Sequence, residues 1–248
     1  MSVSLVSCYY KLPSKHSHNN YDRWIKNLLK NINSNIIIFT SKDLIEYLQD
    51  IGNHNKNMII IEKELETMPL VQKYDNEFWE NQEEIDKNKR CGRTKYCFQI
   101  WNSKFDFLKL AIEMNPFNSD KFIWNDIGSM RDNNYCKNLV TYPNYDKVSK
   151  DKLDIVLLKE YNDTSQMFFE EEVHLSGAMF GGGKEIILEL HKLFYIYFEI
   201  YVKSNKFIGC DQQIMSTLFL KNRKSFNKII PSNQIVNKWF YLYYYYDE

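Results

Sequence analysis

Cysteine, proline and glycine are all scarce in this chain, with 5, 5 and 8 copies among 248 residues. The cysteine count is odd, and no two cysteines have the C-x-x-C spacing of many zinc and redox sites. A chain of this length can also build a core without disulfide staples. We therefore expect reduced thiols in a reducing compartment and no zinc site. Because no Pro-, Gly- or Ser-rich linker and no internal repeat divides the chain, we expect one domain.

Excess charge of either sign is missing as well. Lys and Arg total 32, Asp and Glu total 32, and the formal net charge is zero. A neutral chain has no overall field to attract DNA or RNA, which argues against a general nucleic-acid binder but allows a local pocket for a small phosphorylated ligand. No apolar run reaches the roughly 18 residues of a membrane span, and no signal peptide is evident. The sequence predicts a cytoplasmic protein without a transmembrane segment.

Aromatic residues are plentiful, with 18 Tyr, 16 Phe and 5 Trp. Tyr and Trp present flat, amphipathic surfaces that suit sugar rings and nucleobases. The competing interpretation is compositional: Asn, Lys, Ile and Tyr are abundant and Ala is scarce, as an AT-rich genome produces. A large DNA virus is one such source.

The first 65 residues alternate between strand and helix patterns. The patterns predict strands at residues 3–10, 35–40 and 58–61, and helices at residues 21–31 and 42–50. The strands are apolar throughout, which is typical of a parallel sheet covered on both faces. We therefore predict an α/β, Rossmann-like fold whose residues 1–65 form a nucleotide-binding half. Ligands of such sheets lie at the carboxyl ends of strands, which here include Tyr9 and Thr40.

The rest of the chain, from residue 94 to 248, completes the predicted domain. We expect helices at residues 94–114, 184–203 and 212–221, and strands at residues 121–124, 154–158 and 173–180. Residues 66–93 are polar, and either form helices or a loop that orders over substrate. The aromatic tail at residues 235–246 is expected to pack on the sheet, with dimerisation or a membrane interface as alternatives.

Asp126 follows the strand at residues 121–124, where a carboxylate points into the crevice at the end of the sheet. Oxygen ligands there suit Mg²⁺ or Mn²⁺, which neutralise a departing diphosphate. Asp-x-Asp is the familiar pair after such a strand, but Gly128 stands at the second position. Asp132 completes the pair only if the loop folds back. The competing interpretation is that Asp126 merely caps a turn.

A run of small residues follows His174 and ends in three glycines at residues 181–183. Glycines permit unusual torsions and close backbone approach, so Gly181 and Gly182 are candidates to hold phosphate or sugar oxygens through their amides. Many such runs are plain turns. His174 is either a metal ligand or an ordinary strand residue.

Asp211 and Gln212 stand at a predicted junction between a loop and a helix. A carboxylate and an amide at such a place suit contacts with sugar hydroxyls or with a leaving group. The competing interpretation is that Asp211 is the N-cap of the helix. Lys104 and Arg131 are candidate diphosphate contacts. For Lys104, which lies beside the apolar face of its helix, a solvated lysine is the simpler interpretation.

The order of these segments resembles that of the HtrL/YibB-like family, a poorly characterised group with a predicted GT-A glycosyltransferase fold. Four stretches that together span nearly the whole chain carry the resemblance. They are residues 9–11 with 14–17 and 21–24, residues 38–40, residues 124–131, and residues 176–182 followed by Asp211 and Gln212. The Asp-Gln pair also looks like one in the sugar pocket of glycogenin-like retaining glycosyltransferases, which favours retention slightly.

The resemblance implies a sugar transfer from a nucleotide-sugar, UDP-linked by expectation, to a glycan or protein acceptor. It implies that Asp126 binds metal and diphosphate and that Tyr9 and Thr40 line the nucleotide pocket. Gly181, Gly182 and Asp211 would face the donor sugar or the acceptor. Gly128 departs from the two-carboxylate pattern and puts dependence on Mn²⁺ or Mg²⁺ in doubt. The alternatives are a non-catalytic sugar or nucleotide binder, and a metal-dependent nucleotidyltransferase or phosphohydrolase.

Overall fold

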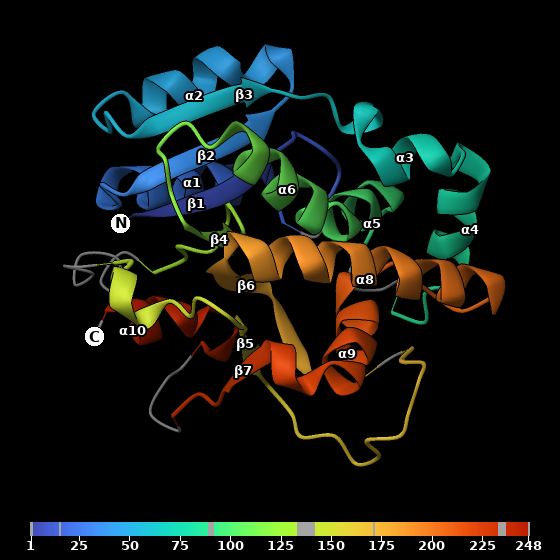
Figure 1. The fold of residues 1–248 in the computed structure, drawn as a ribbon. Coiled ribbons are helices and arrows are strands. Elements are labelled where there is room, and N and C mark those ends of the chain that lie inside the picture. Colours follow the sequence, from blue (N-terminus) through green and yellow to red (C-terminus); the bar gives the residue numbers. More distant parts are fainter. Residues whose placement is uncertain are drawn as a thin grey trace.

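A single seven-stranded sheet runs through the centre of the protein (Figure 1). The structure, a computed structural model, describes residues 2–14, 16–88, 92–132, 142–170, 172–232 and 237–247. The strands lie in the order β3-β2-β1-β4-β6-β5-β7. They are β1 (Val3–Tyr9), β2 (Asn35–Thr40), β3 (Met58–Glu62), β4 (Lys121–Asn125), β5 (Leu153–Leu157), β6 (Leu175–Gly183) and β7 (Phe226–Ile229).

Six of the seven strands point the same way, because β6 is antiparallel to both of its neighbours, β4 and β5. The pairs of β1 with β2, of β1 with β4, and of β2 with β3 are all parallel. The carboxyl ends of β1 to β4 therefore meet at one edge of the sheet. The predicted α/β class and mostly parallel sheet are confirmed.

Helices cover both faces of the sheet. They are α1 (His18–Asn31), α2 (Ile45–Gly52), α3 (Pro69–Lys73), α4 (Asn76–Ile85), α5 (Lys95–Asn102), α6 (Lys104–Met114), α8 (Lys184–Lys203), α9 (Asp211–Lys221) and α10 (Leu242–Asp247). Helices α6, α8 and α9 bury one apolar cluster with side chains such as Val6 and Phe122. Helices α1, α2 and α10 bury a second cluster on the other face, with side chains such as Leu5 and Ile123. Successive strand residues thus point to opposite faces, and both faces are apolar.

The helix predicted over residues 94–114 is two helices, so that prediction was wrong in detail. Helix α5 ends at Asn102, and α6 begins at Lys104. Between them, Ser103 leaves the helical torsions, and its hydroxyl donates to the carbonyl of Gln99. The apolar period runs on across the break, which is why the sequence does not reveal it. Of the segment 66–93, the described part is helical at α3 and α4.

The glycine run at residues 181–183 is not a turn, which corrects the expectation that it forms a loop for phosphate or sugar. The three glycines continue β6 and pair with the first half of β4, where Gly181 lies opposite Ile123 and Gly183 opposite Lys121. Glycine is required there by close packing. A Cβ on Gly182 would lie 2.5 Å from the carbonyl oxygen of Lys152.

The aromatic tail packs into the protein, as expected. Leu242, Tyr243 and Tyr246 of α10 are fully buried. The hydroxyl of Tyr243 donates to Oδ1 of Asn125 at 2.8 Å, and that of Tyr246 donates to Oδ2 of Asp154 at 2.9 Å. These two bonds tie the end of the chain to β4 and β5.

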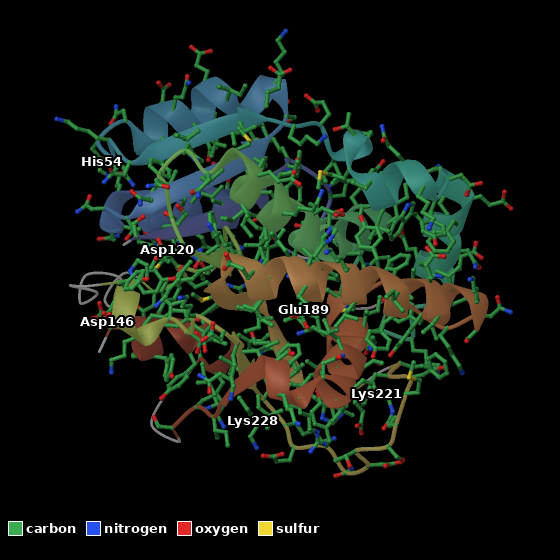
Figure 2. The ribbon with its side chains drawn as sticks, viewed as in Figure 1. His54, Asp120, Asp146, Glu189, Lys221 and Lys228 are labelled. Carbon is green, nitrogen blue, oxygen red and sulfur yellow. The ribbon has the colours of Figure 1, made fainter. Side chains whose placement is uncertain are left out.

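Figure 2 labels charged side chains of both signs on the outside of the protein. Asp146, Glu189 and Lys221 are all exposed, and they lie on separate elements. Within the described residues, no helix combines the length and the apolar character needed to cross a membrane.

We predict that Gly183→Ala destabilises the protein by about 1–3 kcal/mol, because its Cβ would lie 2.2 Å from the carbonyl oxygen of Lys150 and force the backbone apart. Gly52→Ala is the matched control. Its Cβ would meet only the flexible end of Met58 and a more distant Leu29 methyl, and alanine favours the helix. Urea unfolding measures both variants. Equal stabilities would contradict the packing described for β6.

Candidate functional site

Asp126 stands directly after β4 at the carboxyl edge of the sheet. Its backbone N–H donates to the carbonyl of Ala178 at 2.9 Å, which extends the pairing with β6 by one residue. Its Oδ1 accepts a hydrogen bond of 2.7 Å from Nε1 of Trp124. The side chain remains 34% exposed. Asp126 therefore offers a fixed carboxylate to solvent at the place where ligands of such sheets bind.

Lys104 is buried behind Asp126, which corrects the expectation of a solvated lysine. Its Nζ lies 3.4 Å from Oδ1 of Asp126 and 3.0 Å from Oδ2 of Asp211. It also donates to the carbonyl of Gly177 at 2.7 Å. The break before α6 places Lys104 in the first turn of that helix, where its side chain reaches the end of β4. We call Asp126, Lys104 and Asp211 the ionic triad.

Asp211 is the first residue of α9 and does not cap it, because Cys210 holds the N-cap position and the Asp211 side chain turns to Lys104. It is almost fully buried. The absence of a side chain at Gly177 makes the space, since a Cβ there would lie 2.7 Å from Oδ2 of Asp211. Asp211 thus lies behind the lysine and does not open to solvent.

Gln212 faces the sheet and not the exposed carboxylate. Its Nε2 donates to the carbonyl of Leu175 at 2.9 Å, and the Cys210 thiol lies 3.1 Å from its Oε1. These contacts anchor the start of α9 to β6. Gln212 therefore holds Asp211 in place, and it makes no described contact with Asp126 or Lys104.

The charges of the ionic triad support one another. Burial alone would lower the pKa of Lys104, but the carboxylates of Asp126 and Asp211 hold that pKa above its ordinary value. Burial raises the pKa of Asp211, and the Lys104 ammonium opposes this rise. Burial, and then the nearby Asp126, also raise the pKa of the Cys8 thiol at the end of β1, so this cysteine is a neutral side chain.

An aromatic group lies next to the Asp126 turn. The guanidinium carbon of Arg131 is 4.4 Å from the centre of the Trp24 ring and 5.1 Å from that of Phe240. Tyr21 packs edge-on against Trp24 at 5.5 Å, and His16 does so at 4.9 Å. We call His16, Tyr21, Trp24 and Arg131 the aromatic wall. The wall combines the planar Arg131 guanidinium with aromatic rings, which suits a ligand that carries both a charged group and a ring.

Arg131 is held by the turn itself, since its Nε donates to the carbonyl of Gly128 at 3.1 Å. Tyr9 extends the wall, with its ring 6.2 Å from that of Tyr21. Thr40 does not, because it is fully buried and its hydroxyl donates to the carbonyl of Tyr9 at 2.7 Å. The structure thus places Tyr9 beside Tyr21 and Arg131 at the Asp126 turn, and it leaves Thr40 buried in the sheet.

Two other expected site regions lie apart from the triad. His174 is 1% exposed, contacts Oε2 of Glu172 at 2.8 Å and the carbonyl of Lys159 at 3.1 Å, and stacks on Tyr161. It is a satisfied histidine at the start of β6. Gly181 and Gly182 lie at the other end of that strand, opposite the middle of β4, so they do not face the triad.

A divalent cation does not fit the described residues well. Gly128 supplies no second carboxylate, and a Cβ there would be crowded at 3.1 Å from the Trp24 ring and 3.2 Å from the Tyr21 ring. Asp132 is exposed and lies beyond the turn. Within the described ranges, no three His, Cys, Asp or Glu side chains are grouped so that they could hold a metal ion. The carboxylates of Asp126 and Asp211 both form ion pairs with the Lys104 ammonium.

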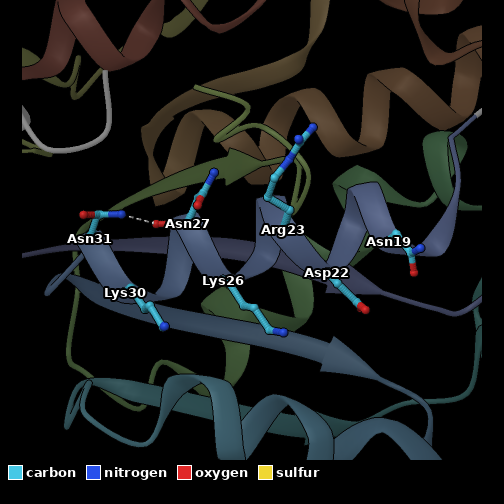
Figure 3. A pocket seen from close by; sticks show the side chains of 7 residues that line it. All are labelled: Asn19, Asp22, Arg23, Lys26, Asn27, Lys30 and Asn31. Atoms are coloured by element: carbon cyan, nitrogen blue, oxygen red, sulfur yellow. Dashed lines mark hydrogen bonds between the residues drawn. The ribbon is translucent and has the colours of Figure 1, made fainter. Parts of the chain in front are cut away.

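A hollow of about 620 Å³ follows the solvent face of α1 (Figure 3). It is lined by Asn19, Asp22, Arg23, Lys26, Asn27, Lys30 and Asn31. Asn27 donates to the carbonyl of Met130 at 3.0 Å, which connects the helix to the segment after Asp126. The side chains that line the hollow are polar or charged, and none of them belongs to the ionic triad.

Comparison with family models gives one match, to the family described as "Bacterial protein of unknown function (HtrL_YibB)", over residues 9–247. This chain belongs to the HtrL_YibB family. The match covers the ionic triad, the aromatic wall and every strand except β1, of which it includes only Tyr9. A comparison with curated proteins gives no match.

We predict that Lys104→Met costs about 3–5 kcal/mol of stability, because it leaves the buried Asp211 carboxylate without its cation. Removing Lys104 raises the pKa of Asp211 further, so the folded variant binds a proton that the unfolded chain releases. Its loss of stability therefore shrinks as the pH falls from about 7 to about 5. Urea unfolding at both pH values measures this.

The matched control is Lys109→Met on the same helix. Lys109 is exposed and pairs with Glu113, so its loss changes stability by no more than about 0.5 kcal/mol at either pH. If the two variants were equally stable at neutral pH, the ionic triad would not be a buried, coupled unit.

Proposed function

We propose that the protein transfers a sugar from a nucleotide-diphosphate sugar, UDP-linked by our expectation, to a glycan or protein acceptor. The observation that carries the proposal is the position of Asp126. It is a partly exposed carboxylate at the carboxyl end of β4, fixed by Trp124 and Lys104, with the aromatic wall beside it. Ligands of mostly parallel α/β sheets bind at this edge.

The chemistry of the group suits such a donor. A carboxylate accepts hydrogen bonds from sugar or ribose hydroxyls, and aromatic faces pack on sugar rings and bases. The Arg131 guanidinium is planar and can bind two phosphate oxygens at once, which stabilises charge that develops on a leaving diphosphate. Its pKa is lowered by burial, with Tyr21 and Asp126 opposing this, and a guanidinium remains charged throughout.

Trp24 offers a further polar group in the wall. Its indole nitrogen is buried, and no acceptor for its N–H is found among the described residues. Buried donors without a partner are uncommon in proteins and call for an explanation. Because this nitrogen has no surface open to solvent, a ligand oxygen reaches it only if the side chains around Trp24 move.

A non-catalytic sugar or nucleotide binder is the second candidate function. The observation in its favour is the lack of a second exposed carboxylate beside Asp126, since Gly128 is packed against Tyr21 and Trp24, and Asp211 is buried. Binding without turnover would identify it. Release of inorganic phosphate or pyrophosphate in place of a nucleoside diphosphate would indicate a phosphohydrolase or nucleotidyltransferase instead.

We predict that UDP and UDP-sugars stabilise the protein against heat, by about 2.7 kcal/mol when the ligand is at a hundred times its dissociation constant. Asp126→Ala should abolish turnover of the UDP-sugar, because it removes the exposed carboxylate. Asp50→Ala, which removes an exposed carboxylate on α2, should have no effect. Thermal-shift screening and measurement of released UDP test both statements.

The controls separate loss of folding from loss of function. Asp126→Ala must first show a cooperative urea transition and be folded under the assay conditions, because the loss of a Lys104 partner lowers its stability relative to Asp50→Ala. If no nucleotide or nucleotide-sugar stabilises the unmodified protein, the proposed function is wrong.

A further inference from the structure

Three oxygen atoms of the protein surround the Lys104 ammonium. They are Oδ2 of Asp211 at 3.0 Å, Oδ1 of Asp126 at 3.4 Å and the carbonyl oxygen of Gly177 at 2.7 Å. An ammonium has three N–H donors and accepts nothing. One of these donors bonds to the carbonyl of Gly177, and the ammonium forms ion pairs with the two carboxylates, so the lysine cannot leave without removing the partner of a buried carboxylate and of a buried carbonyl.

The cage is the place that a divalent cation shared by the two carboxylates would occupy. A cation bound there would lie within a few ångströms of the ammonium and would be repelled by it. The second position after β4, Gly128, is crowded, because a Cβ there would lie 3.1 Å from the Trp24 ring and 3.2 Å from the Tyr21 ring. The buried Lys104 and the crowded Gly128 therefore both disfavour a divalent cation at this site.

We propose that Lys104 takes the place of a divalent cation in this site, and that Asp126 acts as an acceptor for a ligand hydroxyl and not as a metal ligand. The identity of that ligand, a ribose or sugar hydroxyl, rests on the function proposed above. The replacement of the cation by lysine does not rest on it.

The two oxygens of Asp126 have different surroundings, which supports this role. The contacts with Trp124 and Lys104 both use Oδ1. Because the side chain is one-third exposed, Oδ2 is the oxygen that a ligand meets. Lys104 pairs with the carboxylate at Oδ1, and the Arg131 guanidinium, which is held to Gly128 in the same turn, is available for an anionic phosphate group.

The first test is a titration of the unmodified protein with Mn²⁺, followed by electron paramagnetic resonance of the free ion. We expect no saturable site in the unmodified protein or in Lys109→Ala. Lys104→Ala removes the ammonium and leaves both carboxylates. It should bind one Mn²⁺, with an affinity at least about tenfold above the weakest affinity that the titration can detect. Equal affinities of the unmodified protein and Lys104→Ala overturn the proposal, and so does a site in the unmodified protein that Asp126→Asn abolishes.

The second test uses only the unmodified protein, so it stands even if Lys104→Ala does not fold. Calorimetry measures the binding of UDP in EDTA and in Mn²⁺. We expect the two affinities to agree within about threefold, whereas an increase of about tenfold or more in Mn²⁺ overturns the proposal. If UDP binds in neither solution, the proposed function fails, and the Mn²⁺ titration still decides the role of Lys104.

Discussion

The ion pairs of one buried lysine organise the edge of the sheet where we place the function. Lys104 is linked to Asp126 after β4, to Asp211 at the start of α9 and to the backbone of β6 at Gly177. These elements are far apart in the sequence, and the ammonium is the atom group on which they converge. Removing one partner of a buried ion pair lowers stability by far more than the whole pair contributes relative to apolar residues in its place. Such a pair therefore fixes the positions of its residues more than it adds to stability.

Buried partners therefore fix the position and surroundings of the Asp126 carboxylate. Asp126 is partly exposed, while its two partners, Lys104 and Trp124, are buried. The aromatic wall supplies ring faces and a guanidinium at the same turn. Membership of the HtrL_YibB family says nothing of activity, so these contacts are what support a sugar-transfer function.

The sequence predicted the fold well and the site in part. The alternation of apolar strands and helices in the first 65 residues was sufficient for the parallel sheet, because burial on both faces leaves a pattern in the residues themselves. Asp126 was predictable for the same reason, since it follows an apolar strand. The break at Ser103 was not, because the apolar period continues through it and the change lies in the backbone.

What the sequence could not reveal depends on contacts between distant segments. In the sequence Lys104 resembles a solvated lysine. In the structure the paired strands β4 and β6 and the start of α9 bury it. The glycines at residues 181–183 resembled a binding turn, but they serve close strand packing, and the glycine that shapes the site is Gly177. Tyr21 and Trp24 stand in one of the stretches that carry the family resemblance, but the sequence does not show that their rings lie beside Gly128 of the Asp126 turn.

The most direct measurement is a crystal structure of the protein grown with UDP and Mn²⁺, with anomalous scattering used to locate the metal. Our account predicts the nucleotide at the carboxyl end of β4, between Asp126 and the aromatic wall, with the Lys104 ammonium still between the two carboxylates. A nucleotide bound elsewhere, or a manganese ion between Asp126 and Asp211 with Lys104 displaced, would contradict it.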